Sequence, residues 1–433
     1  MAPDPLIVRA VEQLGYRVTV GDVAAKAGID VNLAERGLLA LASDVGAHLQ
    51  VTESGDVAYL FPKNLRGIIR NKYLQLRLKE WWEKVWRVLF YLIRISFGIV
   101  LLISLVLIFV SIFIIVIATN QNREDSNYNH SGNGWIFVPN YFWFDLDWFW
   151  FLSWDYETPY QRQQRSKSAD GKRSQMSFLE AVFSFLFGDG DPNWNLEERR
   201  WQAIAAIIRK NKGAVVAEQI APYLDNVGSG YANKFEEYML PVLARFNGHP
   251  EVSPEGQLIY HFPDLQTTAK TNSPQEAVPS FLREYNWRFS QAKSSQLILA
   301  AGLGVLNFVS GLVLGSLLKG DIAEELGGLV AFVAWIYPVL IGYGTAFLVV
   351  PLVRYFWIQW RNSQIEARNQ IRKKRANVLI KPRATLKKKI EFARQFAAEK
   401  VIDSQNLAYT TETDLLEQEI ERIQRLNSGD EKN

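Results

Sequence analysis

Three long apolar runs punctuate the chain, and each is long enough to form a membrane-spanning helix. Residues 95–118 read ISFGIVLLISLVLIFVSIFIIVIA without a charged residue, a length that crosses a hydrocarbon core of about 30 Å. Residues 297–318 and 327–352 are two further apolar runs, separated by the short polar stretch 319–326. We predict a transmembrane helix at 95–118, too far from the N-terminus for a cleavable signal peptide, and a transmembrane helical hairpin at 297–352.

The second apolar run is rich in glycine. Gly311 and Gly315 have the GxxxG spacing that lets another helix approach closely. None of the three runs carries an ionisable residue near its centre, which favours helix packing over a pore or transport role. The glycine face also makes a homo-oligomer plausible, without fixing the number of copies.

Positive charges flank the apolar runs at two places. Nine Lys or Arg residues lie between 61 and 95 against Glu80 and Glu83, and the stretch after residue 352 is also strongly basic. Both stretches therefore belong on the cytoplasmic side or its organellar equivalent, the stroma. Three crossings cannot place both on one side.

The aromatic segment 135–154, WIFVPNYFWFDLDWFWFLSW, is where a further membrane element is expected. Asp145 and Asp147 would each cost a few kcal/mol at mid-bilayer, whereas aromatic side chains suit the headgroup interface. We predict a membrane hairpin or re-entrant segment there, with a fourth crossing as the alternative.

An internal repeat is visible outside the apolar runs. VTESGDVAYLFP at 51–62 and VSPEGQLIYHFP at 252–263 share Val, Gly, Tyr, Phe and Pro at a constant offset, and His48 matches His249. Alternating apolar and polar residues around a turn predict a two-stranded hairpin in each copy. Upstream, apolar spacing predicts a helix, an extended stretch and two helices, at 5–14, 17–20, 21–27 and 31–43, then at 197–211, 214–216, 217–224 and 231–246.

This order of elements is that of a winged helix. The predicted fold is therefore mainly α with small β wings: two winged-helix-like domains in an internal repeat, plus a helical transmembrane region. The predicted division is as follows: winged-helix-like domain 1 at 1–62, a basic amphipathic linker helix at 63–94, the transmembrane helix at 95–118, the aromatic-rich re-entrant or second membrane segment at 119–177, winged-helix-like domain 2 at 178–264, a linker at 265–296, the transmembrane hairpin at 297–352, and a basic juxtamembrane helix with the C-terminal tail at 353–433.

The charges of the first predicted winged helix argue against nucleic-acid binding. Residues 4–62 contain four basic and eight acidic side chains, and phosphate neutralisation supplies most nucleic-acid affinity. We therefore expect the winged helices to bind proteins. The alternative is a membrane-tethered winged-helix regulator that binds nucleic acid through basic residues of 63–84 or of the tail.

Candidate chemistry is sparse. The chain has no cysteine and only four scattered histidines, which excludes disulfides, Cys-ligated zinc, thiolate nucleophiles and an iron–sulfur cluster held by its own thiolates. GDGDPN at 188–193 begins like an EF-hand loop, but Trp194 stands where Gly is needed and Arg200 where Glu is needed. No phosphate-binding loop, GxSxG elbow or HExxH motif occurs. We predict a non-enzymatic protein with no catalytic, cofactor-binding or metal-binding residues.

The basic stretch 354–400 has Ile358, Ile365 and Ile371 at helical spacing, so we expect it to continue the last membrane helix. Such a segment either binds anionic lipid headgroups or docks onto the acidic winged helices, and both remain open. Residues 414–426, DLLEQEIERIQRL, are typical of a short amphipathic helix.

Three strings carry a resemblance. FLEAVFSFLFGDGDPN, EERRWQAIAAIIRKNKGAVVAEQIAPYLD and RNSQIEARNQIR resemble a family of uncharacterised membrane proteins shared by cyanobacteria and plant chloroplasts, whose plant members are labelled "iron-sulfur cluster biosynthesis family protein". The resemblance implies a thylakoid or plasma-membrane protein of a cyanobacterium, with soluble domains on the cytoplasmic side. It also implies partners among membrane proteins, such as photosystem I subunits or assembly factors. The iron–sulfur label finds no support in a chain without cysteine.

Overall fold

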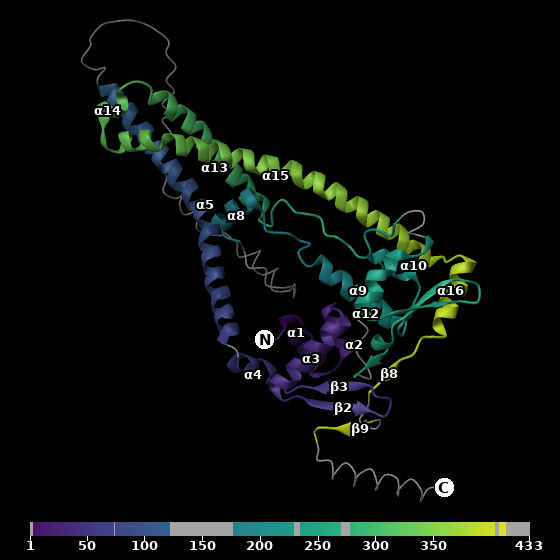
Figure 1. Ribbon diagram of the computed structural model, residues 1–433. Helices are drawn as coiled ribbons and strands as arrows, with labels where there is room; N and C mark the ends of the chain where they lie inside the picture. The colour runs from purple at the N-terminus through teal and green to yellow at the C-terminus, as the bar shows by residue number, and fades with distance from the viewer. Residues whose placement is uncertain are drawn as a thin grey trace, which may run out of the picture. The chain divides into compact units, whose positions relative to one another are not determined.

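The computed structural model describes residues 3–72, 74–121, 176–228, 234–269, 278–402 and 407–412. These residues are mainly helical with a few short strands, as predicted for the fold class at this level (Figure 1). The chain divides into two compact units. The first unit contains residues 1–82, 192–286 and 363–433, and the second contains residues 83–191 and 287–362.

The N-terminal segment of the first unit begins with a capped helix and ends in a hairpin. Asp4 and Asp30 each accept hydrogen bonds from backbone N–H groups of the helix they precede, which fixes the two helix starts. The segment has these elements: α1 (Pro5–Leu14), β1 (Arg17–Thr19), α2 (Val20–Ala27), α3 (Val31–Val45), β2 (His48–Thr52), β3 (Val57–Leu60) and α4 (Leu65–Lys72). The helices and strands predicted between residues 5 and 62 are confirmed.

The middle segment of the first unit has a similar series of elements. They are α9 (Leu196–Lys210), β4 (Ala214–Val215), α10 (Ala217–Ile220), η1 (Ala221–Tyr223), η2 (Glu237–Met239), α12 (Leu240–Phe246), β5 (His249–Val252), β6 (Leu258–His261), η3 (Pro263–Leu265) and β7 (Thr267–Thr268). Two predicted helices are shorter than expected. The helix at 217–224 becomes a 3₁₀ turn at Pro222, because proline interrupts the regular helical hydrogen bonds. In the described part of 231–246 the helix is interrupted at Glu236, which has a left-handed backbone with φ +56°, and α12 begins at Leu240.

The two segments have the same strand order. In the N-terminal sheet β3 lies between β1 and β2, and in the middle sheet β6 lies between β4 and β5, all antiparallel. Leu60 pairs with Arg17 and His48, and His261 pairs with Ala214 and His249. In both segments the short extended stretch before the second helix therefore completes the sheet begun by the hairpin.

One hydrophobic core joins the two segments. It contains side chains of α1, α2 and α3 together with side chains of α9 and α12. Ile7, Leu38 and Leu41 from the first segment, and Ile204 and Phe246 from the second, are almost completely buried in it. Burial of each such side chain contributes about 1.5–3 kcal/mol, so neither segment has a complete core without the other.

The C-terminal segment of the first unit packs on the middle segment. Leu386 and Ala393 of α16 (Ala384–Arg394) form a small core with Val216 and Ile259. Two short strands follow, β8 (Lys400–Val401), which is parallel to β7, and β9 (Leu407–Thr410), which pairs with the outer edge of β2. The edge of the N-terminal sheet is thereby covered by the chain itself.

The second unit is a helical bundle. Its elements are α5 (Leu74–Gln121), α8 (Phe178–Phe187), α13 (Ser294–Leu317), α14 (Ile322–Leu326) and α15 (Gly328–Ile380), of which α5 begins and α15 ends within the first unit. Among the described residues, α5, α13 and α15 are long and apolar enough to cross a membrane, at the positions predicted from the three apolar runs. The expected helical continuation of the last run into the basic stretch is also confirmed, because α15 is continuous to Ile380.

Helices α5 and α13 run in the same direction, and α15 runs against both. Phe97 and Tyr343 meet near one end, where the Tyr343 hydroxyl donates to the Phe97 carbonyl at 2.8 Å. Farther along the bundle, Gly311 lies close to Ile108 and Ile341. The start of the α5 apolar run and the end of the α15 apolar run therefore lie at the same end of this bundle (Figure 1).

The glycine face predicted on α13 is in contact with α15 of the same chain. A Cβ built on Gly304 would lie 2.4 Å from Phe347, and one on Gly315 would lie 2.0 Å from the hydroxyl of Tyr337. Gly311 is less crowded, with 3.3 Å to Ile341. The close approach expected from the GxxxG spacing is thus made within the chain, and the expected homo-oligomer stays a prediction.

Helix α8 belongs to the second unit, whereas the sequence predicts it as the start of winged-helix-like domain 2 at 178–264. Its residues Phe178, Val182 and Leu186 lie four apart on one face and pack against Leu101 of α5 and Leu303 of α13. A helix with such an apolar face is stabilised by packing on other apolar helices. The segment expected at 135–154 lies outside the described residues.

Candidate docking surface and the charges that position it

A buried carboxylate joins the N-terminal and middle segments of the first unit. Asp22 of α2 is only 4% exposed, and Arg209 of α9 donates to it at 2.7 Å. Its two oxygens also accept from the Thr19 and Ala269 backbone N–H groups at 2.9 and 3.0 Å, and from the Thr268 hydroxyl at 2.9 Å. Burial alone would raise the pKa of Asp22, but Arg209 and these donors hold it below its usual value.

A second contact joins the segments at the end of α2. Gly28 ends this helix with a left-handed backbone, φ +65°, and a Cβ there would lie 3.1 Å from the α9 backbone. Its carbonyl accepts from both Nε and Nη2 of Arg245, at 3.1 and 2.9 Å. The guanidinium of Arg245 also stacks 4.3 Å from the centre of the Trp201 ring. The relative position of the two segments is therefore fixed by polar contacts as well as by their shared core.

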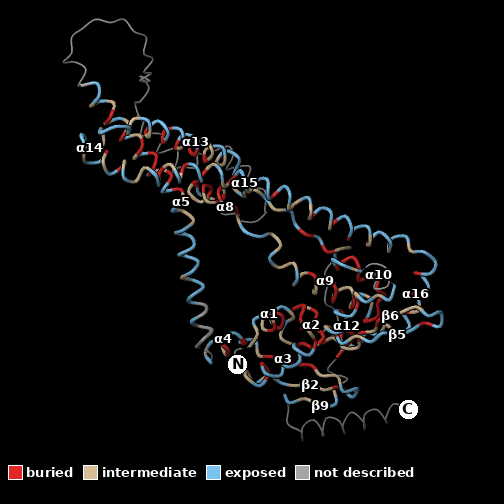
Figure 2. Tube along the Cα trace, turned by 45° about the horizontal axis from the view of Figure 1, so that its top comes forward, coloured by how far each residue is buried: buried red, intermediate tan, exposed pale blue. Residues whose placement is uncertain are grey.

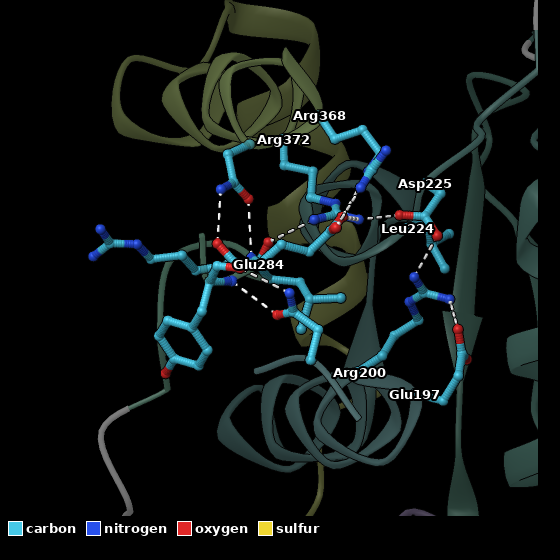
Figure 3. Close-up of polar contacts among 12 residues, drawn as sticks. Glu197, Arg200, Leu224, Asp225, Glu284, Arg368 and Arg372 are labelled. Carbon is cyan, nitrogen blue, oxygen red and sulfur yellow. Dashed lines mark hydrogen bonds and ion pairs between the residues drawn. The ribbon is translucent and has the colours of Figure 1, made fainter. Parts of the chain in front are cut away.

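An ion-pair network attaches the end of α15 to the middle segment (Figure 3). At its centre Arg372, 1% exposed, pairs with Asp225 and with Glu284, the latter at 2.7 Å. Arg368, one turn earlier, donates from Nε and Nη2 to the two oxygens of Glu284 at 2.8 and 2.6 Å. Arg200 of α9 pairs with the other oxygen of Asp225. Three guanidinium groups from two helices thus share two carboxylates.

The same face of α15 also binds the backbone. Asn369 donates to the Glu284 carbonyl at 2.9 Å and accepts from its N–H at 3.0 Å, and Arg375 donates to the Leu224 carbonyl at 2.7 Å. Burial opposes ionisation of Asp225 and Glu284, but the arginines bonded to them lower both pKa values below their usual range. Both groups are therefore charged at neutral pH.

Helix α16 is anchored by a buried lysine. Lys389 donates to Glu218 at 2.9 Å and to Glu236 at 2.6 Å, and the Tyr260 hydroxyl donates to Glu236 at 2.9 Å. Burial, and then the charge of Glu236, raise the pKa of Tyr260. The basic stretch was expected either to bind anionic lipid headgroups or to dock onto the predicted winged helices. The contacts of Lys389 are of the second kind, since they attach α16 to carboxylates of the middle segment.

The outer face of α3 is the candidate docking surface. Ala34, Leu38, Leu41 and Ala42 of this helix face the core, whereas Leu33 and Leu39 are 50% and 57% exposed. In Figure 2 the tube of α3 accordingly includes both buried and exposed residues. We call the exposed Leu33, Glu35, Arg36 and Leu39 the α3 face. The α3 face carries one positive and one negative charge between two leucines.

The EF-hand-like loop has a structural role at the end of α8. The carboxylate of Asp189 pairs with Arg94 at 2.7 Å, and accepts from the Ser184 hydroxyl at 2.6 Å and from the Gln291 backbone N–H at 2.8 Å. Arg354 donates to the carbonyls of Ser184 and Phe185, the last turn of the helix. Among the described residues there is no group of three or more His, Asp or Glu residues placed to hold a metal ion.

No site residues were predicted from the sequence. The arginines of the ion-pair network could nevertheless have been recognised in part. Arg368, Arg372 and Arg375 have the i, i+4, i+7 spacing of one helical face, which is a readable signal. Their partners Asp225 and Glu284 lie far away in sequence, in a loop and an extended stretch without periodicity. Asp145 and Asp147 lie outside the described residues.

Comparison with known proteins supplies a family. The chain is 38% identical over 425 residues to an Arabidopsis thaliana protein named "Uncharacterized protein At5g03900, chloroplastic", and the match covers 95% of this chain and 79% of that protein. The chain belongs to the family of this chloroplast protein. The match confirms the chloroplast side of the resemblance noted in the sequence. No family model and no solved structure matches the chain.

Proposed function

We propose that this member of the family is a non-enzymatic integral membrane protein of a thylakoid-type membrane. In this proposal it docks partner proteins in the biogenesis of photosynthetic complexes such as photosystem I. The observation that supports the docking role is the α3 face. Leu33 and Leu39 are at least half exposed there, on a helix whose opposite face is buried. The three apolar helices and the chloroplast relative support the membrane and its type.

We further infer that the N-terminal and middle segments are two winged helices related by duplication. Their shared strand order, with β3 and β6 central, and the matching hairpin sequences support this inference. In a winged helix the helix before the hairpin is the usual recognition element, and here that helix is α3. The single Arg36 beside Glu35 leaves it without the basic surface that phosphate binding needs.

We place both soluble segments on the cytoplasmic or stromal side. The basic ends of the α5 and α15 apolar runs lie at the same end of the helical bundle, which supports one positive side for both. Arg94 and Arg354 belong to this end.

The test is affinity purification of the C-terminally tagged full chain from gently solubilised membranes of its native host, followed by mass spectrometry. We expect photosystem subunits or assembly factors in the eluate. Leu33→Asp with Leu39→Asp should remove them, because two charges would have to be buried in the contact. Val252→Asp, at a position 62% exposed in the middle segment, is the matched control and should leave them in place.

An eluate without photosynthetic proteins, together with an unchanged photosystem content in a deletion strain, would contradict the proposal. Nuclease-sensitive recovery of nucleic acid with transcription proteins would favour the membrane-tethered regulator instead. Equal loss of partners from the Val252→Asp variant would remove the α3 face as the docking surface.

A further inference from the structure

The basic stretch is divided by the structure into inward and outward charges. Residues 371–390, IRKKRANVLIKPRATLKKKI, contain nine Lys or Arg residues and no acidic residue. Arg372, Arg375 and Lys389 point into the middle segment, where they bind carboxylates or carbonyls, and Lys388 pairs with Glu255 at 3.1 Å. These inward charges are already neutralised or hydrogen-bonded within the protein.

The other five cations form an exposed group at the corner between α15 and α16. They are Lys373, Lys374, Lys381, Arg383 and Lys387, which we call the basic corner. None of them pairs with a carboxylate in the part of the chain that the structure describes. Cations gathered without compensating acid repel one another, so an anionic partner gains attraction from all five at once.

Exposed aliphatic side chains are interleaved with these charges. Ile371 and Val378 are 49% and 48% exposed, and Ile380 at the end of α15 is 73% exposed. Ile371, Lys374 and Val378 of α15 lie at i, i+3 and i+7, so charge and apolar surface share one helical face. Four of the five cations are lysines, which act as flexible point charges and do not impose the planar geometry of a guanidinium.

We propose that the basic corner binds the surface of an anionic lipid bilayer. Its lysines face the headgroup phosphates, and Ile380 with Val378 enters the boundary between headgroups and acyl chains, as in amphipathic surface binding. A nucleic acid would favour aromatic stacking and bidentate arginine contacts, and the corner has no aromatic residue between 371 and 390. This site is separate from the α3 face, so either proposal can fail alone.

The test uses the full chain in nanodiscs of phosphatidylcholine, mixed with vesicles of phosphatidylcholine alone or with added phosphatidylglycerol. We expect co-sedimentation only with the anionic vesicles and a loss of binding in high salt. Each lysine at a membrane surface changes the binding constant about fivefold at low salt. Lys374→Gln, Lys381→Gln and Lys387→Gln together should therefore weaken binding about a hundredfold.

The control is a second triple variant, Arg9→Gln, Lys210→Gln and Lys234→Gln, which removes the same charge from exposed positions of the same unit, away from the α3 face. It should bind like the unchanged chain. Ile380→Ser should weaken binding several-fold without altering its salt dependence. Equal binding by the two triple variants, or binding that prefers single-stranded DNA or an acidic peptide to anionic vesicles, would overturn the proposal.

Discussion

Replacement of Asp22 by Asn tests whether one buried carboxylate holds the N-terminal and middle segments together. The side chain is almost the same size, so the substitution changes charge and hydrogen bonding and leaves the packing volume intact. Asp22 accepts from four donors, three of which belong to residues 209–269. An amide group has only one acceptor oxygen, so its NH₂ would face donors that it cannot satisfy.

Removing one partner of a buried, hydrogen-bonded ion pair costs about 3–5 kcal/mol, because the other charge stays buried. Arg209 is 26% exposed and can partly reach water, which places the expected loss near the lower end, about 3 kcal/mol. For a unit of about 150–250 residues this corresponds to a fall in Tm of roughly 6–12 °C.

The assay is thermal unfolding of the full chain in detergent, combined with hydrogen exchange at residues 267–269. We expect a lower Tm and faster exchange of the Ala269 N–H, which Asp22 accepts at 3.0 Å. Asp264→Asn is the matched control, since Asp264 accepts from the Asn247 side chain at a partly exposed position, and Asn can accept that bond as well. A Tm within about 2 °C of the parent, with unchanged exchange, would refute the assignment of Asp22 as the link.

Three other perturbations have expected outcomes. Arg372→Met should destabilise the first unit by about 3 kcal/mol and expose residues 368–375 to hydrogen exchange, because Asp225 and Glu284 lose their shared cation; unchanged exchange there would contradict this. Gly304→Val should lower the thermal stability of the bundle by about 1–3 kcal/mol through its clash with Phe347, whereas Gly302→Val, with open space around the new Cβ, should have little effect. Acid titration should reduce the free energy of unfolding only below about pH 4. Asp225 and Glu284 have lowered pKa values in the folded state, so they stabilise it fully above their unfolded pKa and lose this contribution as the pH falls through the folded pKa. A loss of stability already near pH 6 would contradict this prediction.

Much of the secondary structure was readable from the sequence because its signals are local. The hairpin at 252–263 is marked by alternation around a turn, and the helices at 5–14 and 31–43 by the spacing of their apolar residues. The apolar runs gave the three long helices directly. These patterns depend only on neighbours within a few residues, which is why they survive without any tertiary information.

The contacts that assemble these elements were not readable. Nothing in the sequence near Asp22 indicates that its partners are Arg209 and Thr268. The glycines of α13 predict a close contact with another helix, but their spacing does not determine whether that helix belongs to a second copy of the chain or is α15. Long-range choices of partner depend on the total burial and charge pairing of the folded unit, which no local window contains.

The joint core of the first unit has a consequence for synthesis of the chain. Ile69 and Ala203 belong to one core, but residues 70–202, including the long apolar helix α5, are made between them. At about 5–20 residues per second, the N-terminal segment waits roughly 7–27 s after its own completion before the first residues of its packing partner are made. In the proposed membrane protein, α5 is delivered to the bilayer during that interval, before the core that α1, α2 and α3 share with α9 and α12 is complete. In that proposal, folding of the first unit finishes only after insertion of α5 has begun.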